Sequence, residues 1–275
     1  YLLINYRIVM RINIFLIFLN LLVSQDSLEI TYFANEGIVI NTANQLIVID
    51  GLFREGVDYG YEKVPASELS RIETGRAPYN QKMLILVSHI HADHFDPQSV
   101  AAALLNNENA RLYSSSQVIS SVYSYLEKSQ FSKRIIDITP QLYQSKKVDF
   151  SEFEIVFHRM RHGYSKNYQI ENIAHLINFK KISLLHIGDA DMIPENFNRL
   201  KINKDQQLVA FLPGWYMTNN QGNSLIDQYI NTKQLIAVHV HPDETSSIKT
   251  SIRRRYEFAD AFIKPLEKRI IYCCK

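Results

Sequence analysis

The sequence predicts an α/β fold in which two β-sheets pack together and carry helices on their outer faces. Short apolar runs typical of strands dominate the first half of the chain, at residues 28–33, 37–41 and 46–50. Helical patterns stand before and between the later strand-like runs, and this order favours two packed sheets with helices outside. With 275 residues, of which 46% are hydrophobic, the chain is long enough to bury one sizeable core.

The first three strands are expected to form a meander, because turn-forming residues separate them. A polar stretch with a short helix at 67–74 follows, and the apolar run 83–87 predicts a buried strand. Asp96 and Pro97 predict a helix start, as N-cap and first helical residue. The later elements are helices at 97–106, 116–127, 223–230 and 246–262 and strands at 134–138, 148–160, 173–179, 182–187, 208–212 and 234–240.

The N-terminal segment differs from the rest of the chain. Residues 12–23 are almost wholly apolar, Arg7 and Arg11 precede them, and a polar stretch follows. This order predicts a signal peptide over residues 1–26, with translation starting at Met10. The apolar run is short for a membrane span, although an uncleaved anchor or a buried strand are the alternatives. We therefore predict export to the periplasm or the extracellular space, and a single domain over residues 27–275.

Charge and cysteine content restrict the partners. The net charge of +2 does not require a nucleic-acid partner, so a small-molecule substrate is expected and nucleic acid is not. The late basic groups at 253–255 and 264–269 are interpreted as solvated helix faces. Cys273 and Cys274 are adjacent, which predicts neither a disulfide framework nor a cysteine-based zinc site.

The run Ser88-His-Ile-His-Ala-Asp-His carries the strongest chemical signal. His89, His91, Asp93 and His94 place three imidazoles and one carboxylate within six consecutive positions. The run lies on a tight loop between a predicted strand and a predicted helix. Neutral imidazole and carboxylate are ligands of zinc and, with less preference, of manganese or iron. The sequence therefore predicts a metal site on this loop.

This run resembles the metal-binding signature of the metallo-β-lactamase fold superfamily. The segments 35–40 and 46–51 resemble the opening hairpin of that superfamily, and Asn172 resembles the start of its strand before the Gly-Asp turn. The resemblance implies a four-layer αββα sandwich of two mixed β-sheets with outer helices. It also implies further metal ligands after later strands, at His162, Asp189 and His239.

The resemblance implies two metal sites that share one carboxylate. His89, His91 and His162 would form the first site, Asp93, His94 and His239 the second, with Asp189 bridging both. His241 competes with His239, since a strand would place both on one face, and His239 fits the superfamily pattern better. Asp191 competes with Asp189 and is disfavoured because Gly188 precedes Asp189. Asp93 is also a candidate catalytic base, and the sequence does not separate that role from ligation.

These residues predict a metal-dependent hydrolase with two divalent metal ions, zinc by preference and manganese or iron as alternatives. Three imidazoles leave an open position for water on a metal ion, and two ions can hold a hydroxide between them. Ester, lactone, lactam, thioester and phosphodiester bonds all suit this chemistry. The rival functions are an iron-dependent redox module and a nucleic-acid-processing nuclease. Trp215 and Tyr164 are candidate substrate contacts.

Overall fold

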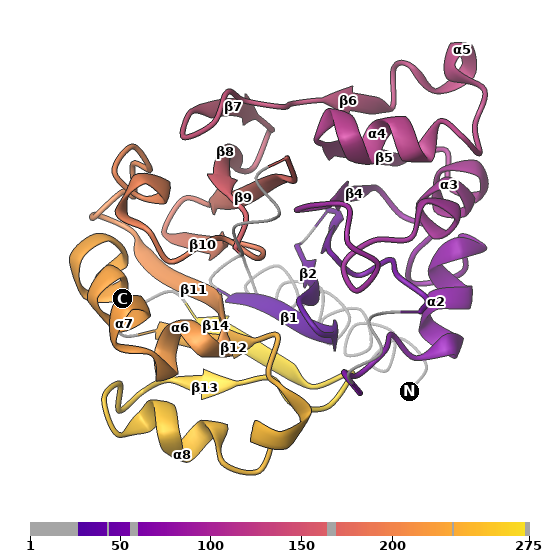
Figure 1. The fold of residues 1–275 in the computed structure, drawn as a ribbon. Helices are drawn as coiled ribbons and strands as arrows, with labels where there is room; N and C mark the ends of the chain where they lie inside the picture. Colours follow the sequence, from indigo (N-terminus) through magenta and orange to yellow (C-terminus); the bar gives the residue numbers. More distant parts are fainter. Residues whose placement is uncertain (1–26, 43, 56–59, 164–168, 233, 273–275) are drawn as a thin grey trace, which may run out of the picture.

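The computed structural model describes residues 27–42, 44–55, 60–163, 169–232 and 234–272. The predicted signal segment, Tyr164 and both cysteines lie outside the described residues. Two seven-stranded sheets pack face to face, with helices on their outer sides (Figure 1). This arrangement confirms the predicted αββα sandwich. No helix within the described ranges is long and apolar enough to cross a membrane.

The first sheet has the strand order β14-β1-β2-β3-β4-β5-β6. Strands β14, β1, β2 and β3 pair antiparallel, whereas β3 to β6 pair parallel, so the sheet is mixed. Its strands are β1 (Ser27–Ala34), β2 (Gly37–Asn41), β3 (Leu46–Ile49), β4 (Met83–Leu86), β5 (Ala110–Ser114), β6 (Ile135–Asp137) and β14 (Lys268–Tyr272).

The second sheet has the order β13-β12-β11-β10-β9-β8-β7. Strands β7 to β10 form an antiparallel meander, and β10 to β13 pair parallel. Its strands are β7 (Ser145–Asp149), β8 (Glu154–Arg161), β9 (Glu171–Asn178), β10 (Ile182–His186), β11 (Gln207–Pro213), β12 (Gln234–Val238) and β13 (Asp260–Ala261).

The helices form the two outer layers, one group on each side of the molecule (Figure 1). The first sheet carries α2 (Ala66–Glu73), α3 (Pro97–Asn106), α4 (Ser116–Val122) and α5 (Lys128–Phe131). The second sheet is accompanied by the short helix η2 (Pro194–Asn196), α6 (Gly214–Thr218), α7 (Asn220–Leu225), the π-helix η3 (Ile226–Ile230), η4 (Pro242–Glu244) and α8 (Ile248–Arg253).

Three apolar clusters join the four layers. Successive side chains of β3 point to opposite faces of the first sheet and so enter different clusters. Leu46 and Val48 belong to the cluster under the outer helices. Ile47 and Ile49 belong to the cluster between the two sheets. A third cluster fills the space between the second sheet and α6 to α8. Each fully buried side chain of this kind stabilises the fold by about 1.5–3 kcal/mol. Both faces of each sheet are therefore buried, which explains the continuous apolar runs in the central strands.

Three sequence predictions about elements were wrong. The single strand expected over 148–160 is the hairpin of β7 and β8, because the chain reverses where Phe150 N donates to Phe153 O at 2.8 Å. The helix expected over 246–262 stops at Arg253, and the chain then joins the second sheet as β13. The basic segment 264–269 is not helical, since β14 pairs with β1 through Lys268 to Tyr272. Strand β5 was not predicted.

Candidate metal centre

The predicted site residues follow strands that all end at one edge of the sandwich. In the first sheet, β1, β3 and β4 run in the same direction, and the loop with His89 follows β4. In the second sheet, β8, β10 and β12 share one direction, and His162, Asp189 and His239 follow their carboxyl ends. This common direction brings residues that are 150 positions apart in the chain (His89 and His239) to one place.

The loop after β4 is a tight turn that leads directly into α3. His94 N and Phe95 N both donate to His91 O, at 3.1 and 3.0 Å. Asp96 then caps α3, with its side chain accepting from Ser99 N at 2.7 Å. The predicted helix start is confirmed, and the short turn keeps the histidine side chains close together.

The first group of site residues contains three imidazoles. His89, His91, His162 and Asp189 each offer one ligand atom, and these atoms all lie within 4.8 Å of one another. His89 Nε2 lies 3.0 Å from His91 Nδ1, and His162 Nε2 lies 3.6 Å from Asp189 Oδ2. The isolated β-bridge between His162 and Ala190 holds this side chain beside Asp189.

The second group combines one carboxylate with two imidazoles. Asp93, His94 and His239 each offer one ligand atom within the same 4.8 Å limit, and all three are buried. Asp93 Oδ2 lies 3.7 Å from His94 Nε2 and 3.3 Å from His239 Nε2. Asn35 Nδ2 donates to the same Asp93 oxygen at 3.1 Å and thereby orients it.

Asp189 lies between the two groups. Its Oδ2 faces the first group, 3.9 Å from His89 Nε2, and its Oδ1 faces the second, 3.6 Å from His94 Nε2 and 3.7 Å from His239 Nε2. Gly188 makes this position accessible, with φ of 56° and no room for a side chain. The two carboxylate oxygens of Asp189 therefore point to two separate clusters of nitrogen donors.

Hydrogen bonds on the outer ring nitrogens orient the imidazoles. His94 Nδ1 donates to Asp50 Oδ2 at 2.9 Å, and His162 Nδ1 donates to Gly163 O at 2.7 Å. Ser88 Oγ donates to Asp50, so its oxygen accepts from His89 Nδ1 at 2.9 Å. In each ring a proton lies on Nδ1, so Nε2 is the nitrogen that faces the centre of the site and that a metal ion would bind.

The three histidines of the loop differ in the direction of their pKa shifts. Burial lowers the pKa of His89 well below its usual value and also lowers the pKa of His91, so both are neutral at pH 7. Burial opposes a charge on His94 too, but Asp189 and Asp93 raise its pKa well above the usual value.

The two carboxylates of the site have lowered pKa values. Burial would raise the pKa of Asp93, but His94 and His239 lower it to about 2. Despite its burial, His239 and His94 hold the pKa of Asp189 well below its usual range.

The donor atoms fit a metal. His94 Nε2, His162 Nε2 and Asp189 Oδ1 are buried and have no hydrogen-bond partner. Most buried polar atoms in proteins are paired, and an unpaired buried group costs about 1–3 kcal/mol. Metal coordination would satisfy these atoms together, and the set of imidazole and carboxylate donors suits zinc or iron.

The structure separates the competing residues that the sequence left open. The ring of His241 turns outward, and its Nδ1 accepts from Asp243 N at 3.2 Å. The positive φ of His239, 48°, ends the strand direction, so His239 and His241 do not share a face. Asp191 bonds Arg161 Nε at 3.0 Å instead of the site. His239 and Asp189 are thus the members of each pair that lie at the centre.

Sequence reasoning missed a buried layer of polar residues under the site. Asp50 follows β3 in an Ile-Asp-Gly sequence, and this strand-end aspartate was the signal that could have identified it. Glu36 is fully buried in the turn between β1 and β2, with neither carboxylate oxygen hydrogen-bonded. His186 Nε2 donates to the Glu36 carbonyl at 3.0 Å, so it contacts this layer and not a predicted ligand. No local pattern marked Glu36 as buried.

Aromatic side chains surround His239. The Trp215 ring centroid lies 4.9 Å from that of His239, and the Tyr61 centroid lies 4.8 Å from it. Both contacts are edge-to-face. His91 and Asp189 are the predicted ligands with partial exposure. Aromatic surface therefore lies beside the candidate metal centre, and the role of Trp215 as a substrate contact stays a prediction.

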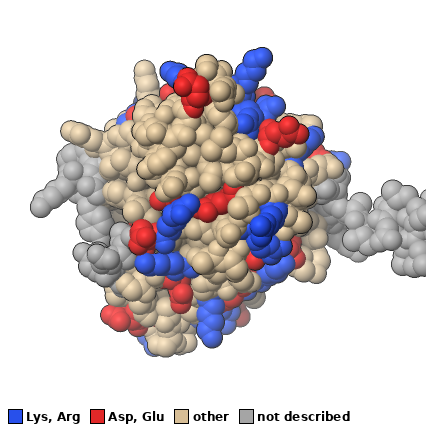
Figure 2. Space-filling model, turned by 90° about the vertical axis from the view of Figure 1, so that its right-hand side faces the viewer, with Lys and Arg blue, Asp and Glu red and all other residues tan. Residues whose placement is uncertain are grey.

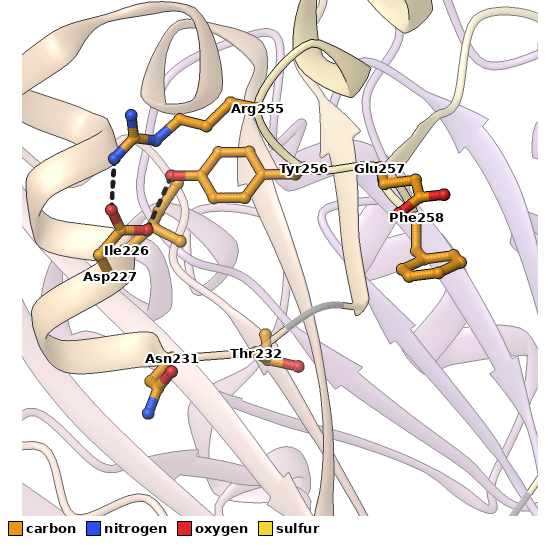
Figure 3. Close-up of a pocket in the computed structure, with 8 residues that line it drawn as sticks. All are labelled: Ile226, Asp227, Asn231, Thr232, Arg255, Tyr256, Glu257 and Phe258. Atoms are coloured by element: carbon orange, nitrogen blue, oxygen red, sulfur yellow. Dashed lines mark hydrogen bonds and ion pairs between the residues drawn. The ribbon is translucent and has the colours of Figure 1, made fainter.

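A cavity of about 710 Å³ lies away from these residues, between the end of η3 and the turn after α8 (Figure 3). One wall is held by Asp227, which pairs with Arg255 and accepts from Tyr256 Oη at 3.2 Å. This cavity lies beside Thr232, before the amino end of β12, whereas His239 follows its carboxyl end. Five strand residues span about 16 Å, so this cavity is separate from the candidate metal centre.

The fold and the clustered donors define the class of protein: a metallo-β-lactamase fold with a metal-binding edge. The family model described as the β-lactamase superfamily domain matches residues 29–239. The chain therefore belongs to this superfamily, and the predicted resemblance is confirmed. No curated protein matches the sequence.

Solved structures share the fold at low sequence identity. A metallo hydrolase from the archaeon Ignicoccus hospitalis is 15% identical, with a TM-score of 0.59 over 89% of this chain and 98% of its own. An isothiocyanate hydrolase from Delia radicum gut bacteria is 12% identical, with a TM-score of 0.61 over 89% and 99%. A diiron β-hydroxylase from Streptomyces venezuelae is 10% identical, with a TM-score of 0.53 over 90% and 55%.

Proposed function

We propose that this protein is a hydrolase with two divalent metal ions, zinc by preference, acting on a small-molecule ester, lactone, lactam, thioester or phosphodiester. The observation that carries the proposal is the position of Asp189, whose two oxygens face separate groups of donors. A carboxylate in this position can bridge two ions. His89, His91 and His162 would hold one ion, and Asp93, His94 and His239 the other.

When bound, two such ions lower the pKa of a water molecule and polarise the carbonyl or phosphoryl oxygen under attack. The residues of the chain hold and orient this centre. Asp50 fixes the His94 ring through Nδ1, and Asn35 fixes Asp93 through Oδ2. The partial exposure of His91 and Asp189 leaves one open side for the substrate.

Asp93 is better suited to hold a metal than to act as a base. Its pKa of about 2 in the metal-free protein makes its carboxylate a weak proton acceptor at neutral pH. The hydrogen bonds from Asn35 Nδ2 to both Asp93 O and Asp93 Oδ2, each 3.1 Å, restrict its rotation. We therefore assign Asp93 as a ligand first, with proton transfer as a second role.

Two rival functions are tested by simple observations. Iron chemistry is the first rival, because a diiron β-hydroxylase shares the fold, and a coloured protein with two irons would favour it. Nuclease activity is the second. The net charge is only +2, and on the face in Figure 2 basic and acidic side chains are interspersed among uncharged ones. That pattern lacks the basic stripe expected of a nucleic-acid groove.

The deciding experiment is metal analysis by mass spectrometry together with a turnover screen of esters, lactones, lactams, thioesters and phosphodiesters. Two zinc ions per chain with turnover of one bond class are the expected result. Two irons would move the function to redox chemistry. A protein that binds no metal after reconstitution would refute the proposal.

Paired histidine variants test the choice between His239 and His241. We expect His239→Ala to lower the metal content by about one ion per chain, because it removes a ring nitrogen 3.3 Å from Asp93. His241→Ala is the matched control and should retain the full content, since its ring faces Asp243. Mass spectrometry of both purified variants gives the answer, and equal losses in the two would contradict the assignment.

Metal binding is expected to release a proton. The raised pKa of His94 means that its ring is charged in the metal-free protein at pH 7, and a metal ion must displace the proton at Nε2. His89 and His91, whose pKa values are lowered by burial, are already neutral. Affinity should therefore rise with pH up to the pKa of His94. Calorimetry in buffers of different ionisation enthalpy measures the release, and a release of zero would contradict this charge state.

A further inference from the structure

We propose that a second cavity, next to the metal centre, is a substrate subsite that takes a ring-sized apolar group carrying a hydroxyl or N–H donor. The cavity has a volume of about 130 Å³ and lies between β1, the segment 60–62 and the segments that follow β12 and β13. The substrate role of this subsite rests on the proposed hydrolase function. Binding of a ligand in the cavity depends only on the residues that line it.

Aromatic and aliphatic side chains form part of the walls of this cavity, beside the polar residues Glu62 and Thr245. Tyr32, Tyr61 and Phe262 supply rings, and Val240 and Ile263 supply aliphatic surface. Tyr32 and Phe262 stack with centroids 5.0 Å apart, so this wall is rigid. A dry cavity of about 150 Å³ accommodates benzene in another protein. The cavity here therefore has room for one six-membered ring and little more.

Asn35 supplies a buried polar contact of the cavity. Its side chain lines the cavity, is 1% exposed, and has no hydrogen-bond partner at Oδ1. Its Nδ2 must face Asp93, because both Asp93 atoms that it contacts are acceptors. This fixes the amide orientation and leaves Oδ1 as an unpaired acceptor. An acceptor that is buried and unpaired beside a cavity favours a ligand with a donor group.

The same residue links the cavity to the second group of metal ligands. Asn35 O accepts from His239 N at 2.8 Å, and Asn35 Nδ2 donates to Asp93 Oδ2 at 3.1 Å. Tyr61 lines the cavity and also packs its ring against His239. A group held in this cavity therefore lies one residue away from the second metal position, close enough for the rest of the same molecule to reach the centre.

The test uses ligand-observed NMR titration of the metal-loaded protein with phenol and with benzonitrile. Both carry one six-membered ring, but phenol has a donor and benzonitrile has only an acceptor. We expect millimolar binding of phenol that is about tenfold tighter than binding of benzonitrile. No phenol binding, or equal binding of the two probes, would overturn the subsite.

Two variants locate the binding. Thr245→Phe and Ile263→Phe fill the cavity from different segments, and each is expected to lower phenol affinity at least tenfold. Ser246→Phe is the matched control, because Ser246 is exposed and not part of the lining. Unchanged phenol affinity in both filled variants would place the probe elsewhere and overturn the proposal. Thermal unfolding confirms that each variant is folded.

Turnover separates this inference from the proposed function. In the filled variants, the ratio of kcat/KM for 4-hydroxyphenyl acetate to that for methyl acetate should fall at least tenfold, while Ser246→Phe keeps it. An unchanged ratio in an active enzyme would overturn the role in substrate selection. A protein that binds phenol in this cavity but hydrolyses no substrate class would refute the hydrolase and support the binding site.

Discussion

Asp189→Ala is expected to lower kcat at least a hundredfold and, in the proposed two-ion centre, to reduce the metal content from two ions to about one. Loss of a hydrogen-bond partner behind a metal ligand already costs about 10–100-fold in affinity or activity, and Asp189 faces both groups of donors directly. Its removal leaves imidazoles on both sides with no shared carboxylate to offset the charge of two ions. Mass spectrometry and steady-state kinetics on one preparation give both values.

The matched control for this variant is Asp191→Ala. Asp191 lies two positions further along the chain, but its carboxylate bonds Arg161 and not the site. The control should keep the metal content of the unmodified protein and most of its turnover. Asp189→Ala should remain folded, because the metal-free site already holds several carboxylates close together and loses one of them. Full turnover in Asp189→Ala would remove the basis for a bridged centre.

The loop with His89 was predictable because its information is local. Four donor side chains fall within six positions, between an apolar run and a capped helix start, and the structure keeps that arrangement. The later site residues were located through the resemblance to the metallo-β-lactamase fold superfamily, which implies ligands after the carboxyl ends of later strands. Strands that run in one direction end at one edge, so His162, Asp189 and His239 meet the loop there.

The supporting residues were not predictable in the same way, because burial of a turn is a tertiary property. Asn35 and Glu36 lie in an ordinary hairpin turn by sequence, but the second sheet covers that turn and leaves both about 1% exposed or less. His239 and His241 were equivalent on a regular strand. The left-handed backbone at His239 separates them, and no residue type in the sequence required that conformation.

The predicted boundaries of elements were wrong where the sequence pattern of a strand continued across a turn. Residues 148–160 alternate well enough for one strand, but the polar pair Ser151 and Glu152 lies in the turn between β7 and β8. Near the C-terminus, the basic residues of segment 264–269 were interpreted as a helix face, although β14 begins at Lys268. In β14, Lys268 and Ile270 are exposed, whereas Ile271 packs against the cluster between the sheets. This segment is a strand because it pairs with β1, which lies more than 230 positions earlier in the chain (Lys268 pairs with Thr31).

Gly188→Ala is expected to destabilise the protein by about 2–5 kcal/mol and to weaken metal binding. Gly188 has φ of 56°, which costs a residue with a side chain about 1–2 kcal/mol. A Cβ atom there would lie 2.4 Å from Asn172 Oδ1 and 2.8 Å from Ser88 Cβ. Relief of such a clash in a packed core costs about 1–3 kcal/mol more.

The clash also reaches the metal centre. Asn172 Nδ2 donates to Ile187 O at 3.0 Å, and Ser88 bonds both Asp50 and His89, so any shift of either residue moves the support of the site. Gly163→Ala is the matched control, since a Cβ there meets its nearest atom, Asp189 O, at 3.5 Å, an ordinary contact. Urea unfolding of both metal-free variants, followed by zinc titration, measures the two effects. Equal stability of Gly188→Ala and Gly163→Ala would show that Gly188 is not needed to position Asp189. A selective loss in Gly188→Ala would show that backbone conformation, as well as the choice of ligands, builds this centre.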